Sequence, residues 1–569
     1  MQHIIQKAHM TIKNWLHCIK KNPLLSLVVA LAFMLYMLVI MPSGTERCID
    51  GRCGMHFWGA HEHDGIWHIA LAQVAFHSIP FSFPTFAGAH LAGYNYLLDI
   101  IIRILSLSGL SAWDLYFRIL PFIWFWIFVY VLSRYAKLYH SDTSFRFFLF
   151  FFVFFSSSLG FVIQYNQSGT TDGSSGIPTM QGALGMTNPQ FMWSVLLLML
   201  LQIILHHRSY LAYLGIVIFA LLGLKIYSVV PLVVILGMSC VQLLKNREWR
   251  RLSEQICMSF FAVLFAYLVF YAGNKSGGIF FDFLSVPKQM IEDPHMWPRL
   301  DLVHQWYTLK QIGTVGPKYI QVVLQIITYF LFFNFGVRLL FFVPLGYYLY
   351  KKITKEVYMR LVLTLIVIVS TLMPILFIQS GDWWNTIQFL YFGLFFASIL
   401  LADTIYIVWK TYARIGIICV LICAILFLPT QMDILRRFYV DQSSIISAYE
   451  VTMLQKLSKM KRGVVLVQPF EQSADETLAS SYDTAYVAAL SGKQVYFGDI
   501  KQLELLNIRY APRQKSLLDS AHCVDLTDIE YVYLRKVMRS FIHYDNCVAQ
   551  SKRYRIADEN AVSKLWMRK

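Results

Sequence analysis

The sequence has few charged residues for its length of 569 residues. Asp, Glu, Lys and Arg make up 14% of the chain, against about 25% in a typical soluble domain. Hydrophobic residues reach 57% and aromatic residues 16%. This composition argues against a soluble cytosolic enzyme. An intrinsically disordered chain is excluded because apolar surface is abundant.

Several catalytic and nucleotide-binding motifs are also absent. The chain contains no Walker A motif, no GxGxxG after a strand-like run, no HExxH and no GxSxG. These absences argue against a nucleotide-driven pump and against the common hydrolase frameworks, so no nucleotide cofactor is expected. No internal repeat or low-complexity segment is present either. Repeats are common in transporters, so their absence argues against that class.

Acidic residues are missing from the N-terminal region, where none precedes Glu46. Four lysines lie before the apolar run 23–41, which has the length of a membrane span. The alternative, a signal peptide, is disfavoured because no small-residue cleavage site follows the run and many further spans do. The positive flank predicts a cytoplasmic N-terminus, with residues 42 to about 114 outside.

Further apolar runs predict about eleven spans, with the C-terminus outside. They lie near 115–133, 146–163, 190–205, 210–224, 227–244, 256–272, 319–350, 359–379, 387–408 and 415–430. Segments on the cytoplasmic side of this topology carry 18 basic and 4 acidic residues, which accounts for +14 of the net charge of +16. The positive-inside rule therefore explains the charge, and no nucleic-acid partner is expected.

Two apolar segments need separate treatment. The run 319–350 is too long for one straight span, and we expect one crossing with a tilted or re-entrant part broken at Pro344–Gly346. The segment 90–108 carries Asp99 and Arg103, which suits a helix lying at the membrane interface. Their i, i+4 spacing predicts a mutual ion pair.

The C-terminal segment 431–569 is polar and has a different pattern. Alternating runs predict strands at 463–468, 493–497 and 529–534, with a helix near 484–490 between them. The prediction is therefore a mainly α protein with two parts. Residues 1–430 form a polytopic bundle of transmembrane helices that includes the first outside loop, and 431–569 form a small extracytoplasmic α/β domain.

The nine cysteines fit this division. Cys48 and Cys53 lie in the first outside loop, and Cys523 with Cys547 are the pair in the tail. Both pairs would face an oxidising compartment and are candidate disulfides. The remaining cysteines lie in or near spans, or on the cytoplasmic side, and are interpreted as ordinary core residues.

The densest polar cluster lies in the first outside loop, between residues 56 and 68. It holds four histidines and two carboxylates within thirteen residues: His56, His61, Glu62, His63, Asp64 and His68. Imidazole and carboxylate groups can bind a divalent ion, and a carboxylate can act as general base on a hydroxyl. The alternative is a solvated loop whose histidines cap a helix.

Three other features are candidates for binding. The aromatic loop at 81–96, with Tyr94, suits contact with headgroups or a sugar ring. The short turn at 379–388 presents Asp382, Asn385 and Gln388, although an aromatic belt with a polar turn explains it equally well. Lys225 lies at the end of a span, where a lipid phosphate would pair with it; snorkelling to the headgroups is the alternative.

Together these features resemble a known family. A first span from the cytoplasm is followed by a large outside loop with the acidic motif Glu62-His63-Asp64, two interfacial helices, many spans and a soluble outside tail. This pattern is similar to the GT-C superfamily of integral-membrane glycosyltransferases, which use polyprenyl-phosphate sugars. The segments 64–68 (DGIWH) and 491–498 (SGKQVYFG) also resemble uncharacterised bacterial and archaeal members of this group.

The resemblance implies sugar transfer at the outer face of a prokaryotic plasma membrane, to a glycan, lipid or protein acceptor. Asp64, or alternatively Glu62, would be the general base. His61, His63 and His68 would bind a divalent metal or orient the phosphate, and Lys225 would hold the donor phosphate. The substrate pocket would be lined by five residues: Trp67, Tyr94, Asp382, Asn385 and Gln388. The extra histidines depart from the simpler acidic motif of the family.

Two other functions compete with this interpretation. A transporter or flippase of a lipid-linked sugar would need charges deep in the spans, where few are found. Lys225, Arg338 and Asp403 are the main ones. A non-catalytic membrane scaffold would leave the histidine and carboxylate cluster without a role.

Overall fold

The structure is a computed structural model. It describes residues 22–171, 188–207, 212–273, 278–294, 296–313, 315–344, 355–379, 383–439, 444–470, 483–519 and 522–569. Asp382 and most of the loop 164–189 lie outside these residues. The chain divides into two compact units. The first contains Met1–Met37, Phe122–Leu264 and Gly278–Arg436, and the second contains Leu38–Pro121, Phe265–Gly277 and Arg437–Lys569. The second unit contains both the first outside loop and the tail, and the division at residue 430 stays a prediction.

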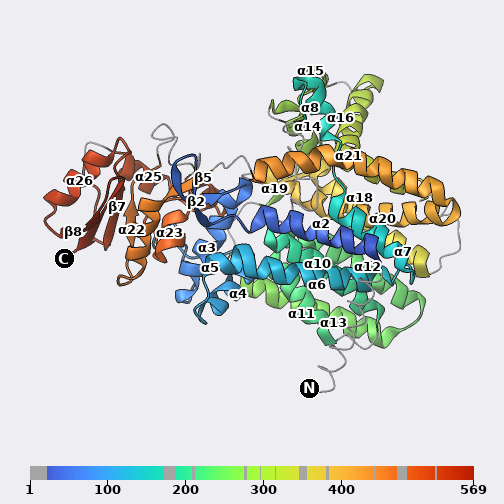
Figure 1. Cartoon of the computed structure of the whole chain (residues 1–569), viewed down its shortest axis with the longest axis horizontal. Coiled ribbons are helices and arrows are strands. Elements are labelled where there is room, and N and C mark those ends of the chain that lie inside the picture. Colours follow the sequence, from blue (N-terminus) through green and yellow to red (C-terminus); the bar gives the residue numbers. More distant parts are fainter. Residues whose placement is uncertain are drawn as a thin grey trace. The chain divides into compact units, whose positions relative to one another are not determined.

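The first unit is a bundle of apolar helices (Figure 1). Within the described residues, nine helices are long and apolar enough to cross a membrane, or ten if one bent pair counts as a single span. The run 210–224 yields only α11 (Leu214–Leu224), whose 11 residues extend about 17 Å of the ~30 Å needed. The orientation of the spans stays a prediction. The candidate helices are α2 (Pro23–Ile40), α6 (Leu120–Ala136), the bent pair α7 (Thr143–Phe155) with α8 (Gly160–Ser168), α10 (Pro189–His206), α12 (Val229–Lys245), α13 (Trp249–Ala266), α16 (Pro317–Phe335), α18 (Lys355–Leu376), α20 (Gln388–Thr411) and α21 (Ala413–Tyr439).

Helix α20 forms the centre of this bundle, and it packs against α18 and α7. Every residue from Phe389 to Tyr406 is buried. The one carboxylate in this stretch, Asp403, accepts hydrogen bonds from Arg360 of α18 at 2.6 and 3.0 Å and contacts His140 Nε2 at 2.7 Å. The buried charge is thus matched by a charge from a neighbouring helix, as burial requires.

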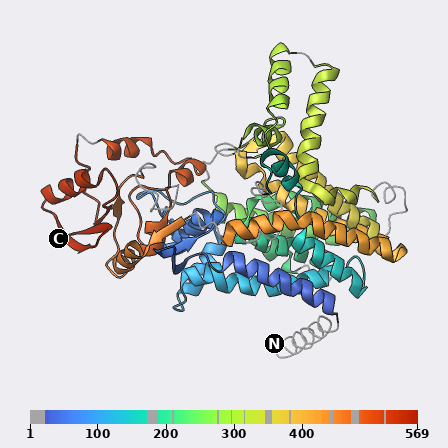
Figure 2. The same cartoon turned by 45° about the horizontal axis from the view of Figure 1, so that its top comes forward.

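The long run 319–350 gives one candidate span, Pro317–Phe342, as expected. Its geometry changes at Gly336, which has a φ of 55° and where α16 passes into the 3-10 helix η7 (Gly336–Phe342). This change precedes the expected break at Pro344–Gly346, of which only Pro344 lies within the described residues. Helix α15 (Leu300–Ile312) packs along α16, and the two form a hairpin that stands off the bundle (Figure 2).

The second unit begins with a three-stranded antiparallel sheet. Strands β1 (Thr45–Ile49) and β2 (Arg52–Phe57) form a hairpin, and β2 also pairs with β5 (Ser444–Ser447) from the tail. Gly54 lies directly against the backbone carbonyl of Ile446, where a Cβ has no room. The glycine in the sequence RCGMHF therefore permits the first loop and the tail to share one sheet.

The tail contains a four-stranded sheet of order β6-β7-β9-β8, with helices around it (Figure 1). β6 (Val465–Val467) runs parallel to β7 (Tyr531–Arg535), while β9 (Ser563–Arg568) is antiparallel to both β7 and β8 (Tyr554–Glu559). The helices are α22 (Ala448–Ser458), α23 (Tyr486–Ser491), α24 (Ile500–Leu505), α25 (Ala511–Leu518) and α26 (Phe541–Gln550).

One expected strand of the tail is wrong. Residues 493–497 form only isolated bridges, from Val495 to Val465 and from Phe497 to Phe86. The run bends away after one residue because it must contact both β6 and the aromatic loop of the first outside segment. The expected runs 463–468 and 529–534 do become β6 and β7, and the helix near 484–490 becomes α23.

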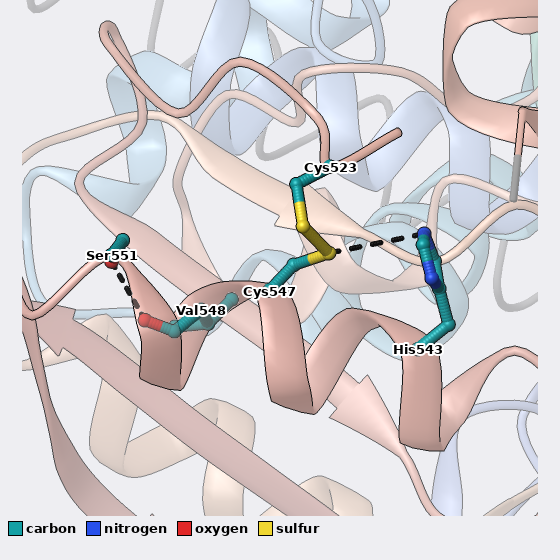
Figure 3. Close-up of a disulfide and its surroundings, with 5 residues drawn as sticks. All are labelled: Cys523, His543, Cys547, Val548 and Ser551. Atoms are coloured by element: carbon teal, nitrogen blue, oxygen red, sulfur yellow. Dashed lines mark hydrogen bonds between the residues drawn. A yellow bond between two sulfur atoms is a disulfide. The ribbon is translucent and has the colours of Figure 1, made fainter. Parts of the chain in front are cut away.

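Both candidate disulfides are present. Cys48 and Cys53 face each other across the β1–β2 hairpin. Cys547 of α26 is bonded to Cys523, and His543 lies one turn before it, with Nε2 at 3.9 Å from the Cys547 sulfur (Figure 3). The second bridge ties α26 to the segment that leads into β7.

Replacing both Cys523 and Cys547 by alanine should destabilise the tail by about 3 kcal/mol, because the bridge spans 24 residues and restricts the unfolded chain. The Cys48–Cys53 bridge spans only 5 residues, so its removal should cost less, about 2 kcal/mol. Pulse proteolysis across a urea gradient measures both. Equal resistance of the wild type and the Cys523/Cys547 double variant contradicts the expectation.

Candidate functional site

The predicted site lies in the second unit, at the point where the first outside loop enters a helix. A short 3-10 helix, Gly59–Glu62, leads into α3 (Asp64–Val74). Asp64 is the first residue of α3, and its side chain is 47% exposed. The next residue is Gly65, and a larger residue would not fit there because its Cβ would lie 2.9 Å from the ring of Phe117. Asp64 is thus the accessible carboxylate of the Glu62-His63-Asp64 motif, held at a helix N-terminus, which favours negative charge.

His63 lies between two carboxylates. Its Nδ1 is 3.3 Å from Asp64 Oδ1, and its Nε2 is 3.0 Å from Asp499 Oδ1. Both partners accept hydrogen bonds, so both ring nitrogens must donate and the ring is an imidazolium. Burial alone lowers the pKa of His63, but the carboxylates of Asp499 and Asp64 outweigh it and raise that pKa to about 10. His63 is therefore a cation, and it holds the Asp64 carboxylate in position.

Asp499 was not identified from the sequence. It lies directly before α24, is completely buried, and has a φ of 55°. Its Oδ1 also accepts a hydrogen bond from the Gln502 amide at 3.4 Å. A non-glycine residue in this conformation carries strain that the surrounding structure must hold. The one available signal was its position immediately after the 491–498 segment that carries the family resemblance.

A second carboxylate, the half-buried Asp483, lies beside Asp499. Asp483 accepts a hydrogen bond from the Ile500 amide at 3.3 Å. Burial and the charge of Asp499 raise the pKa of Asp483 to about 7, although Arg535 opposes the shift. The tail thus contributes two neighbouring acids, Asp483 and Asp499, and Asp499 is the one that contacts His63.

The other residues of the cluster point elsewhere. His61 is fully buried, with Nδ1 at 2.6 Å from Ser43 Oγ, and Glu62 accepts a hydrogen bond from the Ser444 hydroxyl at 2.5 Å. His68 Nδ1 lies 3.1 Å from both oxygens of Asp99. No group of three or more His, Cys, Asp or Glu side chains that could hold a metal ion is found in the part of the chain that the structure describes.

The three histidines predicted as metal ligands therefore do not fit a common ion. His63 uses both nitrogens on carboxylates, and the Nδ1 atoms of His61 and His68 contact Ser43 and Asp99. An imidazolium has no lone pair to offer a metal. We derive no step of the chemistry through a metal for this reason.

The expected ion pair between Asp99 and Arg103 is wrong. Asp99 lies on the buried face of α4 (Leu97–Ser106) and pairs with His68, whereas Arg103 bonds to His77 Nδ1 at 3.1 Å. Burial raises the pKa of the Asp99 carboxyl, and the His68 ring opposes that effect. The amphipathic character predicted for this segment is present, since Ile101 and Ile104 are exposed.

Tyr94 lies near Trp67 of α3, with ring centres 6.1 Å apart. Tyr94 is half-buried and also contacts the His68 ring. Trp67 is fully buried and packs against Phe83, so a substrate cannot reach it in this structure. Of the two aromatic residues expected to line a pocket, only Tyr94 is accessible.

Lys225 and the 379–388 turn come together in the first unit. The Lys225 ammonium lies 5.6 Å from the centre of the Tyr227 ring, and the Tyr227 hydroxyl donates to Gln379 Oε1 at 2.6 Å. Gln388 in turn donates to Asn385 at 3.1 Å. Lys225 is buried at the end of α11. Tyr227 thus connects Lys225 to Gln379, the first residue of the turn.

The charge state of His63 predicts a pH dependence. The pKa of His63 in the folded protein, about 10, exceeds the ordinary value of 6.5, so its stabilising effect is complete below pH 6.5 and is lost as pH rises towards 10. The melting temperature of the wild type should therefore fall more between pH 7 and pH 10 than that of His63→Gln.

His77→Gln is the matched control for this measurement. Burial and the charges of Arg103 and Arg462 lower the pKa of His77, so it loses no charge over this range. This variant should keep the decline of the wild type. If His63→Gln shows the same decline as well, His63 is not the titrating group.

Comparisons with known proteins give structural similarity only. No protein-family model matches the chain, and no curated protein matches it. An oligosaccharyltransferase of Archaeoglobus fulgidus, in complex with Zn and sulfate, superposes with a TM-score of 0.48 at 10% identity, over 89% of this chain and 68% of its own. The AglB oligosaccharyltransferase of the same organism, with an inhibitory peptide and a dolichol-phosphate, gives 0.47 at 11% identity, over 94% and 73%.

ArnT from Cupriavidus metallidurans, bound to undecaprenyl phosphate, gives a TM-score of 0.33 at 10% identity, over 95% of this chain and 97% of its own. All three TM-scores are below 0.5. No inference about the activity of this chain follows from values of this size.

Proposed function

We propose that this chain is a membrane glycosyltransferase of the GT-C type, which moves a sugar from a polyprenyl-phosphate donor to a hydroxyl acceptor on the extracytoplasmic face. One observation carries the proposal: Asp64 is exposed at the start of α3 and is held by a protonated His63, which is itself anchored on the buried Asp499. A carboxylate held in this way can receive a proton from a hydroxyl without a change of its own position.

The chemical step assigns one role to each group. Asp64 accepts the proton of the acceptor hydroxyl as the acceptor oxygen bonds to the anomeric carbon of the sugar. The bond from that carbon to the phosphate oxygen breaks, and the polyprenyl phosphate leaves with the bonding electrons. The acceptor is a glycan, lipid or protein hydroxyl.

Glu62 is less suited to this role than Asp64. Its side chain is buried, and one carboxylate oxygen already accepts the Ser444 hydroxyl. A base must be reachable by the hydroxyl that it deprotonates. We therefore assign Glu62 to holding the first loop against β5.

Lys225 is proposed, on separate grounds, as the cation that binds the donor phosphate. It is a buried ammonium at the end of an apolar helix, next to the ring of Tyr227, whose hydroxyl bonds to Gln379 of the 379–388 turn. Stabilisation of the charge that develops on the leaving phosphate is the effect expected of such a group. Asn385 and Gln388 are proposed to contact the sugar.

The test uses the purified full chain in neutral-lipid nanodiscs with a panel of polyprenyl-phosphate sugars. The measured quantity is free polyprenyl phosphate released in the presence of membrane extract as the source of acceptor. Release from at least one donor, dependent on the protein, is the expected result. In proteoliposomes, movement of intact donor across the membrane without release would instead establish a flippase. If neither release nor movement occurs, the transferase proposal is contradicted.

A further inference from the structure

A second polar pocket lies in the second unit, on the opposite end of α3 from Asp64. It has a volume of about 560 Å³, and it is lined from the first loop by Gln73, His77 and Trp113 and from the tail by Ser458, Arg462 and Lys493. Gln73 follows Asp64 by nine residues on the same helix, a distance of about 14 Å along its axis. The pocket is therefore separate from the proposed catalytic carboxylate.

Two guanidinium groups meet at this pocket on one histidine. The Nδ1 atom of His77 accepts hydrogen bonds from Arg103 at 3.1 Å and from Arg462 at 2.9 Å, while its Nε2 donates to the Gln73 carbonyl at 2.8 Å. The ring is consequently neutral, since Nδ1 must offer its lone pair. Two arginines that share one acceptor atom are close enough to repel each other.

A third cation lies in the same pocket. Lys493 is buried, and its ammonium donates to the Met460 carbonyl at 2.8 Å and lies 5.4 Å from the centre of the Tyr531 ring. Burial and the charge of Arg462 lower the pKa of Lys493, and burial with Arg462 also lowers that of Arg103. These shifts agree with a concentration of positive charge.

No carboxylate compensates this charge among the residues that the structure describes. Arg103, Arg462 and Lys493 take part in none of the ion pairs found there. Three cations around one pocket repel each other and destabilise the folded protein. An anion that binds in the pocket would offset this repulsion. Planar guanidinium pairs favour the oxygens of phosphate in particular.

We propose that this pocket binds a phosphate ester through Arg462 and Lys493, which line it, with Arg103 adding positive charge through its contact with His77. The indole of Trp113 and the amide of Gln73 at the same pocket suit the organic part of such a ligand. Pockets of this volume hold ligands of the size of a sugar phosphate. The phosphate belongs either to a soluble ester or to a lipid headgroup, because Ile101 and Ile104 leave an apolar face of α4 exposed next to Arg103.

The experiment measures binding to the full chain in phosphatidylcholine nanodiscs. Hexose 1-phosphate and inorganic phosphate are titrated against the wild type, Arg462→Gln and Arg509→Gln, and the titrations are repeated in nanodiscs that contain phosphatidylglycerol. Arg462 is exposed, and among the described residues its one side-chain hydrogen bond goes to His77, so its loss should leave the fold intact, as melting curves can verify. Arg509 is an exposed arginine of the same unit, outside the pocket.

Arg462→Gln should weaken hexose 1-phosphate binding on the order of tenfold or more, since a charge-assisted hydrogen bond is lost, while Arg509→Gln leaves it unchanged. Competition by phosphatidylglycerol in the wild type but not in Arg462→Gln would identify the lipid headgroup as the source of the phosphate. Equal binding by the wild type and Arg462→Gln in every arm overturns the proposal, and so does equal weakening by Arg509→Gln. The outcome is independent of sugar transfer, because the readout is binding alone.

Discussion

Asp64→Asn is expected to lower the rate of sugar transfer by roughly 10² to 10⁴-fold, the contribution of a general base. Asparagine has the same shape but cannot accept the proton of the acceptor hydroxyl. The side chain is 47% exposed at the N-terminus of α3 and contacts His63. The fold should therefore survive, and the loss should appear in kcat more than in KM. Release of polyprenyl phosphate over time measures it.

Two variants control for the effects of charge and of the motif. Asp50→Asn removes an acid from the exposed turn of the β1–β2 hairpin, in a positive-φ conformation that asparagine tolerates, and should keep full activity. Glu62→Gln removes the buried acid of the motif and should lower stability more than kcat. Transfer at the wild-type rate in Asp64→Asn would exclude Asp64 as the base, and a selective loss in Glu62→Gln would move that role to Glu62.

Arg360→Ala should reduce the free energy of unfolding by about 3–5 kcal/mol, the usual cost when one partner of a buried ion pair is removed. Asp403 is 1% exposed near the end of the buried stretch of α20, and both of its oxygens accept hydrogen bonds from Arg360. Only the contact with His140 remains in the variant. Thermal unfolding in detergent, followed by loss of monomer, measures the change.

Arg250→Ala provides the matched control. Arg250 also pairs with an acid, Glu254, but its side chain is 91% exposed, and exposed pairs contribute between about 0 and 1 kcal/mol. A double variant, Arg360→Met with Asp403→Leu, should recover much of the loss because no charge is left buried. If Arg360→Ala lowers the free energy of unfolding no more than Arg250→Ala does, the Arg360–Asp403 ion pair does not hold α18 to α20.

The helices of the first unit could be predicted well from the sequence, because an apolar run of about 20 residues has few alternatives to a span. The run 210–224 shows the limit of this reasoning. Its composition is that of a span, but only 11 of its residues form the helix α11. The 3-10 turn η5 (Ile226–Ser228) follows, and Tyr227 then bonds to Gln379. That tertiary contact has no counterpart in local hydropathy.

The loop that contains the candidate site could be predicted from the sequence, but the hydrogen-bond partners of its residues could not. The density of His and acid residues at 56–68 identified the loop that contains Asp64. The partners of these residues come from far along the chain: Asp499 for His63, Ser444 for Glu62, and Asp99 for His68. Spacing predicts neighbours on one helix, as it did wrongly for Asp99 and Arg103, but it carries no information on which helices meet.

The strand pairing of the first loop also has a consequence for synthesis. The pairing of β2 is complete only when β5 joins it, and the paired residues His56 and Ile445 are 389 positions apart in the sequence. At a synthesis rate of about 5–20 residues per second, the loop that carries Asp64 waits roughly 20 to 80 seconds for its last strand. During that time one edge of the hairpin is open to other chains. The protein therefore acquires a finished first loop as one of the last events of its biogenesis, after every helix of the bundle has been made.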